Sequence, residues 1–144
     1  MTLPTWMRGA LFATAGMNLI GAVAFAPPAR ALRAFAGMPE GGHPLYLATV
    51  SMFVLLFGLA YLWAALAGHA DRLFVTVAAA GKLAFFSLLV WFWVAGAVPS
   101  RAPLAGMGDL IFGILFLKWL FTAEADPADA QMDSRNIEAD SGAY

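Results

Sequence analysis

Long apolar stretches separated by short polar segments dominate the first 123 residues of the chain. A helix that crosses the roughly 30 Å hydrocarbon core of a bilayer needs about 20 mostly apolar residues, at about 1.5 Å of rise per residue. Four stretches meet this length: residues 8–26, 45–67, 73–98 and 103–123. We expect them to be helices, because lipid offers no hydrogen-bond partner to an open backbone. The pattern therefore predicts an all-α integral membrane protein, a four-helix bundle with short loops.

Local signals support these boundaries. Helix-ending residues follow the first three stretches: Pro27, Gly68 and Pro99. The fourth stretch begins at Pro103, or at Asp109 as the N-cap of a shorter helix if the intervening glycines delay it. Aromatic residues that favour the headgroup level lie near the predicted ends: Trp6, Tyr46, Tyr61, Trp63, Trp91, Trp93 and Trp119. The first stretch ends in an A-x-A-like sequence, as signal peptides do, but its length and the following Pro27 favour a retained helix.

Residues 28–36, between the first two stretches, predict a short helix that lies on the membrane surface. Arg30 and Arg33 fall on one face of this helix, and Leu32 and Phe35 fall on the other. A helix of this kind buries its apolar face at the membrane interface. We therefore expect Arg30 and Arg33 to contact lipid phosphates.

Composition excludes several classes of protein. The chain is 62% hydrophobic and 12% charged, contains no cysteine and has a formal net charge of -1. Soluble domains are about 45–50% apolar and about 25% charged. The chain is therefore neither an ordinary soluble domain nor a disulfide-rich secreted scaffold, and it lacks the basic charge of a nucleic-acid binder. We therefore expect the lipid bilayer to be a binding partner of this protein.

The small net charge conceals two different regions. Residues 1–123 contain seven basic and three acidic residues, whereas residues 124–144 contain one basic and six acidic residues. We predict that residues 124–144 form a disordered acidic tail, because they have little apolar surface to bury. An even number of spans places both termini on one side of the membrane. We assign that side to the cytoplasm, although basic residues are equally frequent near the two faces.

Polar side chains inside the predicted spans are candidate functional residues, because a charge at the bilayer centre costs at least about 2.5–3.5 kcal/mol. Lys82 is the clearest case, and Asp109 and Asn18 follow. Counted from the loop near Ser100, Lys82 lies about 27 Å deep and Asp109 only about 13 Å deep. Direct pairing then requires a kink, a water molecule or another helix, and Asn18 is an alternative neighbour for Lys82. Three interpretations stay open: a polar network that fixes helix register, a proton, ion or ligand site, and a Lys82 side chain that bends toward the membrane interface.

Glu40 and His43, three residues apart before the second span, are further candidates for binding a ligand or an ion. The second histidine, His69, falls at the opposite membrane face, and no spacing of Cys, His or Glu typical of a metal site occurs. No phosphate-binding loop or nucleophile elbow is present either. We therefore predict no catalytic residue, no metal and no cofactor.

The chain resembles the small bacterial membrane proteins of the DoxX-like group. The resemblance lies in the four-span layout, in the short loops and in the polar position at Gly81 and Lys82 in the third span. The resemblance covers residues 7–123. It implies a compact four-helix bundle and, for some members, quinone-dependent redox chemistry as membrane partners of soluble enzymes. This chain has Lys82 where an acidic residue is expected inside the bundle, and no functional residue is carried over.

These observations predict a structural or accessory membrane protein rather than an enzyme, one that self-associates or partners a soluble or membrane protein. One alternative is a binder or carrier of a hydrophobic small molecule, a quinone or a lipid, whose polar head meets Lys82. A further alternative is a small proton- or cation-coupled transporter that acts as an oligomer.

Overall fold

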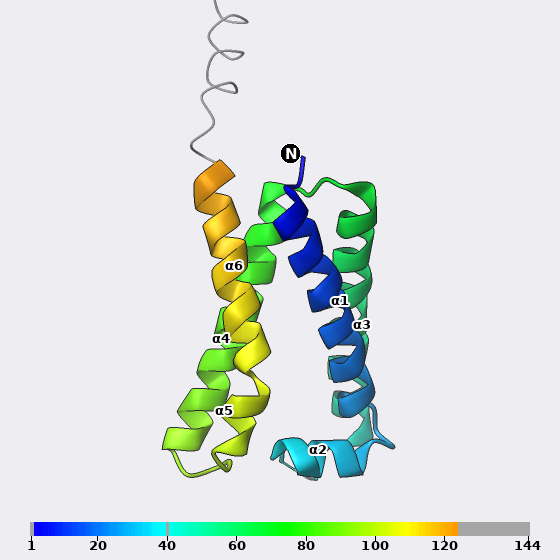
Figure 1. Ribbon diagram of the computed structural model, residues 1–144. Coiled ribbons are helices and arrows are strands. Elements are labelled where there is room, and N and C mark those ends of the chain that lie inside the picture. The colour runs from blue at the N-terminus through cyan, green and yellow to red at the C-terminus, as the bar shows by residue number, and fades with distance from the viewer. Residues whose placement is uncertain (1, 40, 124–144) are drawn as a thin grey trace, which may run out of the picture.

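The computed structural model describes residues 2–39 and 41–123 and is all-helical, as predicted (Figure 1). Its helices are α1 (Thr5–Phe25), α2 (Arg30–Ala36), α3 (Pro44–Ala67), α4 (Arg72–Val94), α5 (Arg101–Ala105) and α6 (Met107–Ala123). Thr2 and His69 form an isolated antiparallel β-bridge beside them. The predicted acidic tail, residues 124–144, and the candidate residue Glu40 lie outside the described residues.

Capping residues set the tight connection between α3 and α4. Gly68 ends α3 with a φ of 72°, a left-handed conformation that glycine adopts without a steric penalty. Three residues later, the Asp71 carboxylate accepts hydrogen bonds from the backbone N–H groups of Leu73 and Phe74 and starts α4. The short connection makes the two helices antiparallel.

The second half of the chain departs from the predicted boundaries. α4 ends at Val94, whereas the predicted third span reaches residue 98. The predicted fourth span is divided at Gly106 into the short α5 and the longer α6. Gly106 is buried, and a side chain there would collide with Leu89 of α4. The break therefore lies at a close contact with α4, where a β-carbon would require the end of the Leu89 side chain to move.

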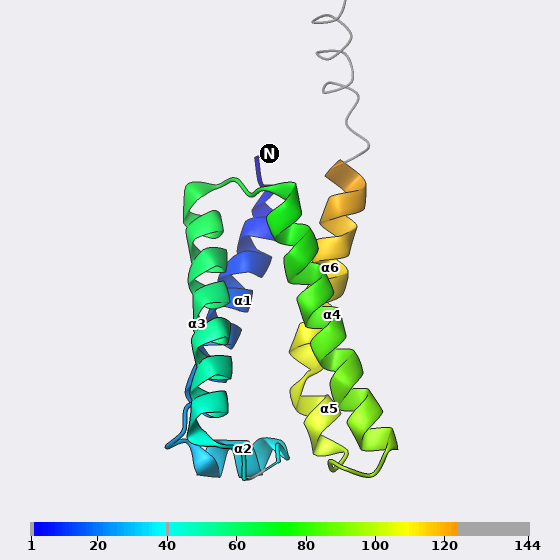
Figure 2. The same ribbon diagram turned by 180° about the vertical axis from the view of Figure 1, so that it is seen from behind.

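The long helices form two antiparallel pairs, α1 with α3 and α4 with α6 (Figure 1). The pairs meet at the end that holds the N-terminal segment and the α3–α4 loop, and they diverge toward α2 and α5 (Figure 2). The main core lies at the closed end, where these side chains are buried together: Met7, Leu11, Tyr61, Ala65, Val75, Phe116 and Trp119. The fold is thus packed at one end and open at the other.

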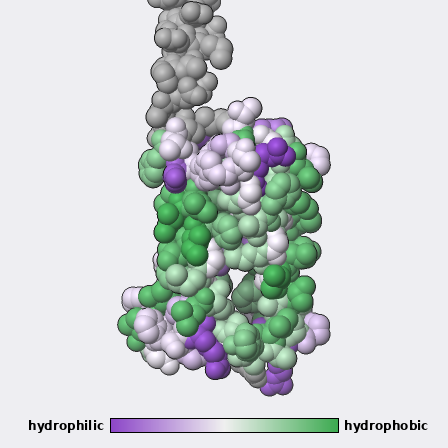
Figure 3. All heavy atoms as spheres, in the orientation of Figure 1, coloured by the Kyte–Doolittle hydropathy of each residue, from purple (hydrophilic) through white to green (hydrophobic). Residues whose placement is uncertain are grey.

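Three helices, α1, α3 and α4, are long and apolar enough to cross a membrane. α6 has 17 residues and is shorter than these three. Large apolar side chains are exposed between the two ends of the molecule, among them Ile20 and Leu59. Hydrophobic surface covers this middle zone, and hydrophilic residues gather at the two ends (Figure 3). Apolar exposure on this scale is typical of a surface that faces lipid rather than water.

Candidate functional site

A cavity of about 430 Å³ occupies the space between the two helical pairs. The surface is visibly hollowed between the pairs on the side shown in Figure 3. Ligand pockets in proteins commonly measure about 300–1,000 Å³. Most of the wall is apolar, and it includes Met17, Ile20, Phe25, Met38, Val50, Phe53, Val54, Phe57, Val77 and Phe85.

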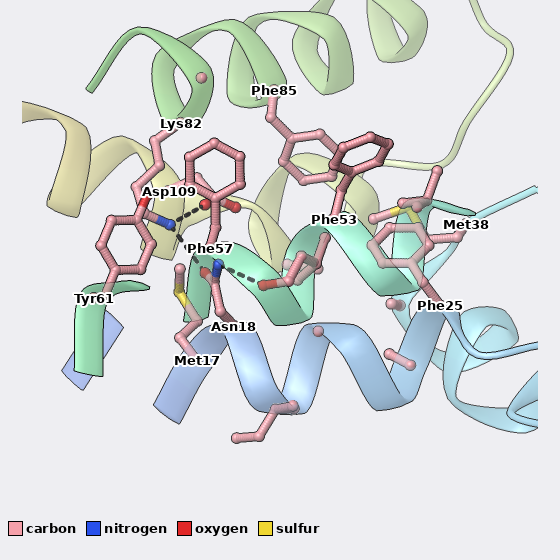
Figure 4. A pocket seen from close by; sticks show the side chains of 18 of the residues that line it. Met17, Asn18, Phe25, Met38, Phe53, Phe57, Tyr61, Lys82, Phe85 and Asp109 are labelled. Carbon is pink, nitrogen blue, oxygen red and sulfur yellow. Dashed lines mark hydrogen bonds and ion pairs between the residues drawn. The ribbon is translucent and has the colours of Figure 1, made fainter. Parts of the chain in front are cut away.

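Lys82 of α4, Asp109 of α6 and Asn18 of α1 meet in the wall of this cavity (Figure 4). The Lys82 ammonium lies 2.8 Å from Asp109 Oδ1 and donates a second hydrogen bond, of 3.3 Å, to Asn18 Oδ1. The side chain of Lys82 is 6% exposed and that of Asp109 is 19% exposed. The sequence prediction named all three residues, and the structure brings them together as one polar cluster.

Direct contact between Lys82 and Asp109 corrects the depth estimate made from the sequence. That estimate treated the chain around Ser100 as continuous helix, whereas α4 ends at Val94 and α5 begins only at Arg101. Lys82 lies twelve residues before the end of α4, about 18 Å, and Asp109 lies eight residues after the start of α5, about 12 Å. The remaining difference of about 6 Å is within the reach of a lysine side chain.

The position of Asp109 also differs from the N-cap alternative. It is the third residue of α6, and its backbone N–H donates a hydrogen bond to the carbonyl of Gly106. A carboxylate in the first turn is stabilised by the positive end of the helix dipole. The break at Gly106 therefore places the Asp109 carboxylate in the first turn of a helix, where its charge is stabilised.

Asn18 connects the polar cluster to the other helical pair. Its amide nitrogen donates a 3.1 Å hydrogen bond to the carbonyl of Val54 on α3. Gly58 allows the close approach, since a β-carbon at residue 58 would lie 3.1 Å from the β-carbon of Asn18. One amide thus links α1 to α3 through Val54 and to α4 through Lys82.

Aromatic rings enclose the ammonium, and the sequence prediction did not include them in the site. The Lys82 nitrogen lies 5.6 Å from the ring centre of Tyr61 and 6.0 Å from that of Phe112. Rings at this distance attract a cation through their π-electrons. Tyr61 is only 2% exposed, which contradicts its assignment to the headgroup level. The spacing along α3 could have indicated this buried position. Tyr61 follows Phe57 and Gly58 by about one helical turn, so the three residues share the inward face of the helix.

Arg33 does not face outward as expected. It is 6% exposed, lines the cavity, and its guanidinium donates hydrogen bonds to the carbonyls of Ala24, Ala26 and Pro27. These carbonyls lie at and just beyond the end of α1, where the last carbonyls of a helix have no partner within the helix. Arg33 therefore joins α2 to α1 instead of reaching lipid phosphates. Arg30 is exposed, and its contact with phosphate stays a prediction.

His43 lies away from the polar cluster and has a local role. Its Nδ1 accepts a 3.2 Å hydrogen bond from the backbone N–H of Leu45 and so caps α3. Its ring is exposed and packs edge-on against Tyr46. His43 is not among the residues that line the cavity.

Comparisons with known proteins add no further information about this site. No protein-family model matches the chain, and neither curated proteins nor solved structures include a significant match. The resemblance to the DoxX-like group therefore stays a prediction.

Proposed function

We propose that this protein binds a hydrophobic small molecule, a quinone or a lipid, in the cavity between its helical pairs, with Lys82 meeting the polar head. The single observation that carries this proposal is the cavity itself, which has apolar walls and a polar cluster of Lys82, Asp109 and Asn18. Sites for small molecules typically combine such walls with a few convergent polar groups.

The membrane setting belongs to the same proposal. We infer that α6, at 17 residues and about 26 Å, crosses the bilayer together with α5 as the fourth element of the bundle. The N-terminal segment and the end of α6 lie at the same end of the molecule, which supports an even number of crossings (Figure 1). A bacterial cytoplasmic membrane with both ends in the cytoplasm remains the predicted setting.

The cavity favours binding over a purely structural role. Helices that only hold a bundle together gain stability from close packing of small residues, because van der Waals contact drives their association in lipid. Here Gly81 of α4 lines an open volume instead of a packed contact. A β-carbon at Gly81 would meet no atom within 4 Å, so the space opposite this glycine is empty of protein.

Native mass spectrometry of protein purified from its membrane in mild detergent tests this function. We expect the wild-type protein to retain an apolar small molecule, and Gly81→Leu to lose it by filling the cavity. Gly16→Leu is the matched control, because Gly16 also has nothing within 4 Å but does not line the cavity. A wild-type protein that carries no molecule, or equal retention in Gly81→Leu, would contradict the proposal.

A further inference from the structure

We infer that the ligand has an uncharged, oxygen-bearing head, a carbonyl or a hydroxyl group, rather than an anionic or cationic one. This inference rests on the proposed function and specifies the chemistry of the same site. It follows from the charge of the polar cluster, from the hydrogen-bonding groups left over there, and from the apolar openings of the cavity.

The polar cluster has no net charge to offer. Lys82 and Asp109 are 2.8 Å apart, so their combined charge is zero whichever of the two holds the proton. A phosphate or carboxylate that approached Lys82 would also lie close to the Asp109 carboxylate, and an ammonium would lie close to Lys82. Repulsion between like charges is strong where water is scarce. Both kinds of charged head are therefore disfavoured.

Arg33, the remaining charged side chain in the cavity wall, does not change this balance. It comes from α2, which lies at the open end of the molecule, whereas Tyr61 belongs to the core at the closed end (Figure 1). Its guanidinium is already bonded to three backbone carbonyls of the segment that ends α1. Because Arg33 is only 6% exposed and its guanidinium is bonded to these carbonyls, it leaves little room for direct contact with a ligand head.

The polar cluster nevertheless has hydrogen bonds to give. A lysine ammonium has three N–H donors, and within the described residues Asp109 and Asn18 accept two of them. Asp109 also lines the cavity, and a carboxylate has a second oxygen that can accept a hydrogen bond. A carbonyl oxygen can accept from Lys82, and a hydroxyl can also donate to Asp109. A plain hydrocarbon would leave these groups without partners at a cost in binding.

The rest of the cavity suits an apolar tail that extends into the surrounding lipid. Phe53 of α3 is 54% exposed and Val77 of α4 is 48% exposed, although both line the cavity. Such side chains form the rim of an opening between α3 and α4. The cavity therefore needs to hold only the head and the first part of the molecule.

A set of probes with identical tails tests this inference: cetyl alcohol, cetyl sulfate and cetyltrimethylammonium. The delipidated protein in a nonionic detergent is mixed with equal amounts of the three, and native mass spectrometry measures what it retains. We expect the alcohol to be retained about tenfold more than either charged probe. Equal or greater retention of the sulfate or the ammonium probe would overturn the inference and leave the proposed function standing. Retention of none of the three would count against the proposed function itself.

Variants of the polar cluster test whether its charge, rather than the shape of the cavity, selects the ligand head. Asp109→Asn keeps the size of the side chain but leaves the Lys82 charge uncompensated, so we expect a shift of about tenfold toward cetyl sulfate. Lys82→Met leaves the carboxylate and is expected to shift retention toward the ammonium probe. Asp71→Asn is the matched control, because Asp71 caps α4 outside the cavity and asparagine caps equally well. An unchanged ranking in folded Asp109→Asn would show that charge cancellation does not select the ligand.

Discussion

The Lys82 ammonium of α4 lies 2.8 Å from the Asp109 carboxylate of α6, and this ion pair closes the polar end of the cavity. Breaking a buried pair by removing one partner typically costs about 3–5 kcal/mol, because the other charge stays behind without compensation. We expect Asp109→Leu to be the more harmful single change, since it leaves a lysine that is 5% exposed. Thermal unfolding in detergent, followed by tryptophan fluorescence, measures the loss.

Removing both charges tests whether the loss of stability comes from the unpaired charge that a single substitution leaves behind. We expect the double variant Lys82→Met with Asp109→Leu to recover most of the stability, because two apolar side chains of similar volume leave no unpaired charge. The charge-swapped variant, Lys82→Asp with Asp109→Lys, should restore expression lost in the single variants. Equal losses in the single and the double variants would contradict direct coupling of the two residues.

The apolar pattern was sufficient to predict that the described residues are helical and that α1, α3 and α4 are long and apolar enough to cross a membrane, because a run of about 20 apolar residues has few other structures available. It was not sufficient to predict the contact of Lys82 with Asp109. That contact depends on where α4 ends and where α5 begins, and a helix end is set by packing against neighbours that the pattern does not name. An error of four residues along a helix moves a side chain by about 6 Å.

Tyr61 and Arg33 show a second limit of the sequence prediction. Both are amphipathic, with a long apolar part and a polar tip, and such side chains are favoured at a membrane interface. In this fold each is buried, Tyr61 beside the Lys82 ammonium and Arg33 beside the carbonyls that end α1. Composition cannot distinguish an interfacial position from a buried one when a neighbouring helix supplies the polar partner.

Close packing of α1 and α3 at Gly58 yields a second prediction. The Asn18 β-carbon and the Ala15 carbonyl lie 3.1 Å and 3.5 Å from the position of a β-carbon at residue 58. We expect Gly58→Val to push the helices apart and to cost about 1–3 kcal/mol of stability. Gly16→Val is the matched control, because a β-carbon at Gly16 meets nothing within 4 Å. Similar unfolding temperatures for the two variants would argue against the close approach.

The bonds from Arg33 to the end of α1 yield a third prediction. Hydrogen bonds that involve a charged group each contribute about 1.5–3 kcal/mol, and Arg33 makes three of them in a buried position. We expect Arg33→Met to lower stability by at least about 1.5 kcal/mol, and Arg33→Lys to restore little of it, since an ammonium lacks the planar fork. Arg30→Met, on the exposed side of α2, is the control and should have the smaller effect. Equal effects at the two positions would contradict the assigned role of Arg33.

The fourth prediction concerns Thr14, where we expect a substitution to raise stability rather than lower it. Its side chain is fully buried in α1, and its hydroxyl has no hydrogen-bond partner within the described residues. Thr14→Val keeps the shape and removes the unsatisfied group, so we expect a gain of about 1 kcal/mol. Thr76→Val is the control, since the Thr76 hydroxyl is exposed and donates to the carbonyl of Arg72. Lower stability of Thr14→Val would mean that this hydroxyl does have a partner, such as a bound water.

The number of membrane crossings is the last prediction, and the absence of cysteine from the chain makes it accessible to labelling. Single cysteines are placed at His69 in the α3–α4 loop, at Ala97 in the α4–α5 connection and at Thr122 near the end of α6, all of them exposed. A membrane-impermeant maleimide should label His69→Cys and Ala97→Cys from opposite sides of the bilayer. If α6 crosses the membrane, Thr122→Cys should be labelled from the same side as His69→Cys. Leu59→Cys, in the exposed middle of α3, is the control and should react poorly from either side because lipid covers it. Labelling of Thr122→Cys from the side of Ala97→Cys would mean that only α1, α3 and α4 cross, and that α6 returns without spanning the bilayer.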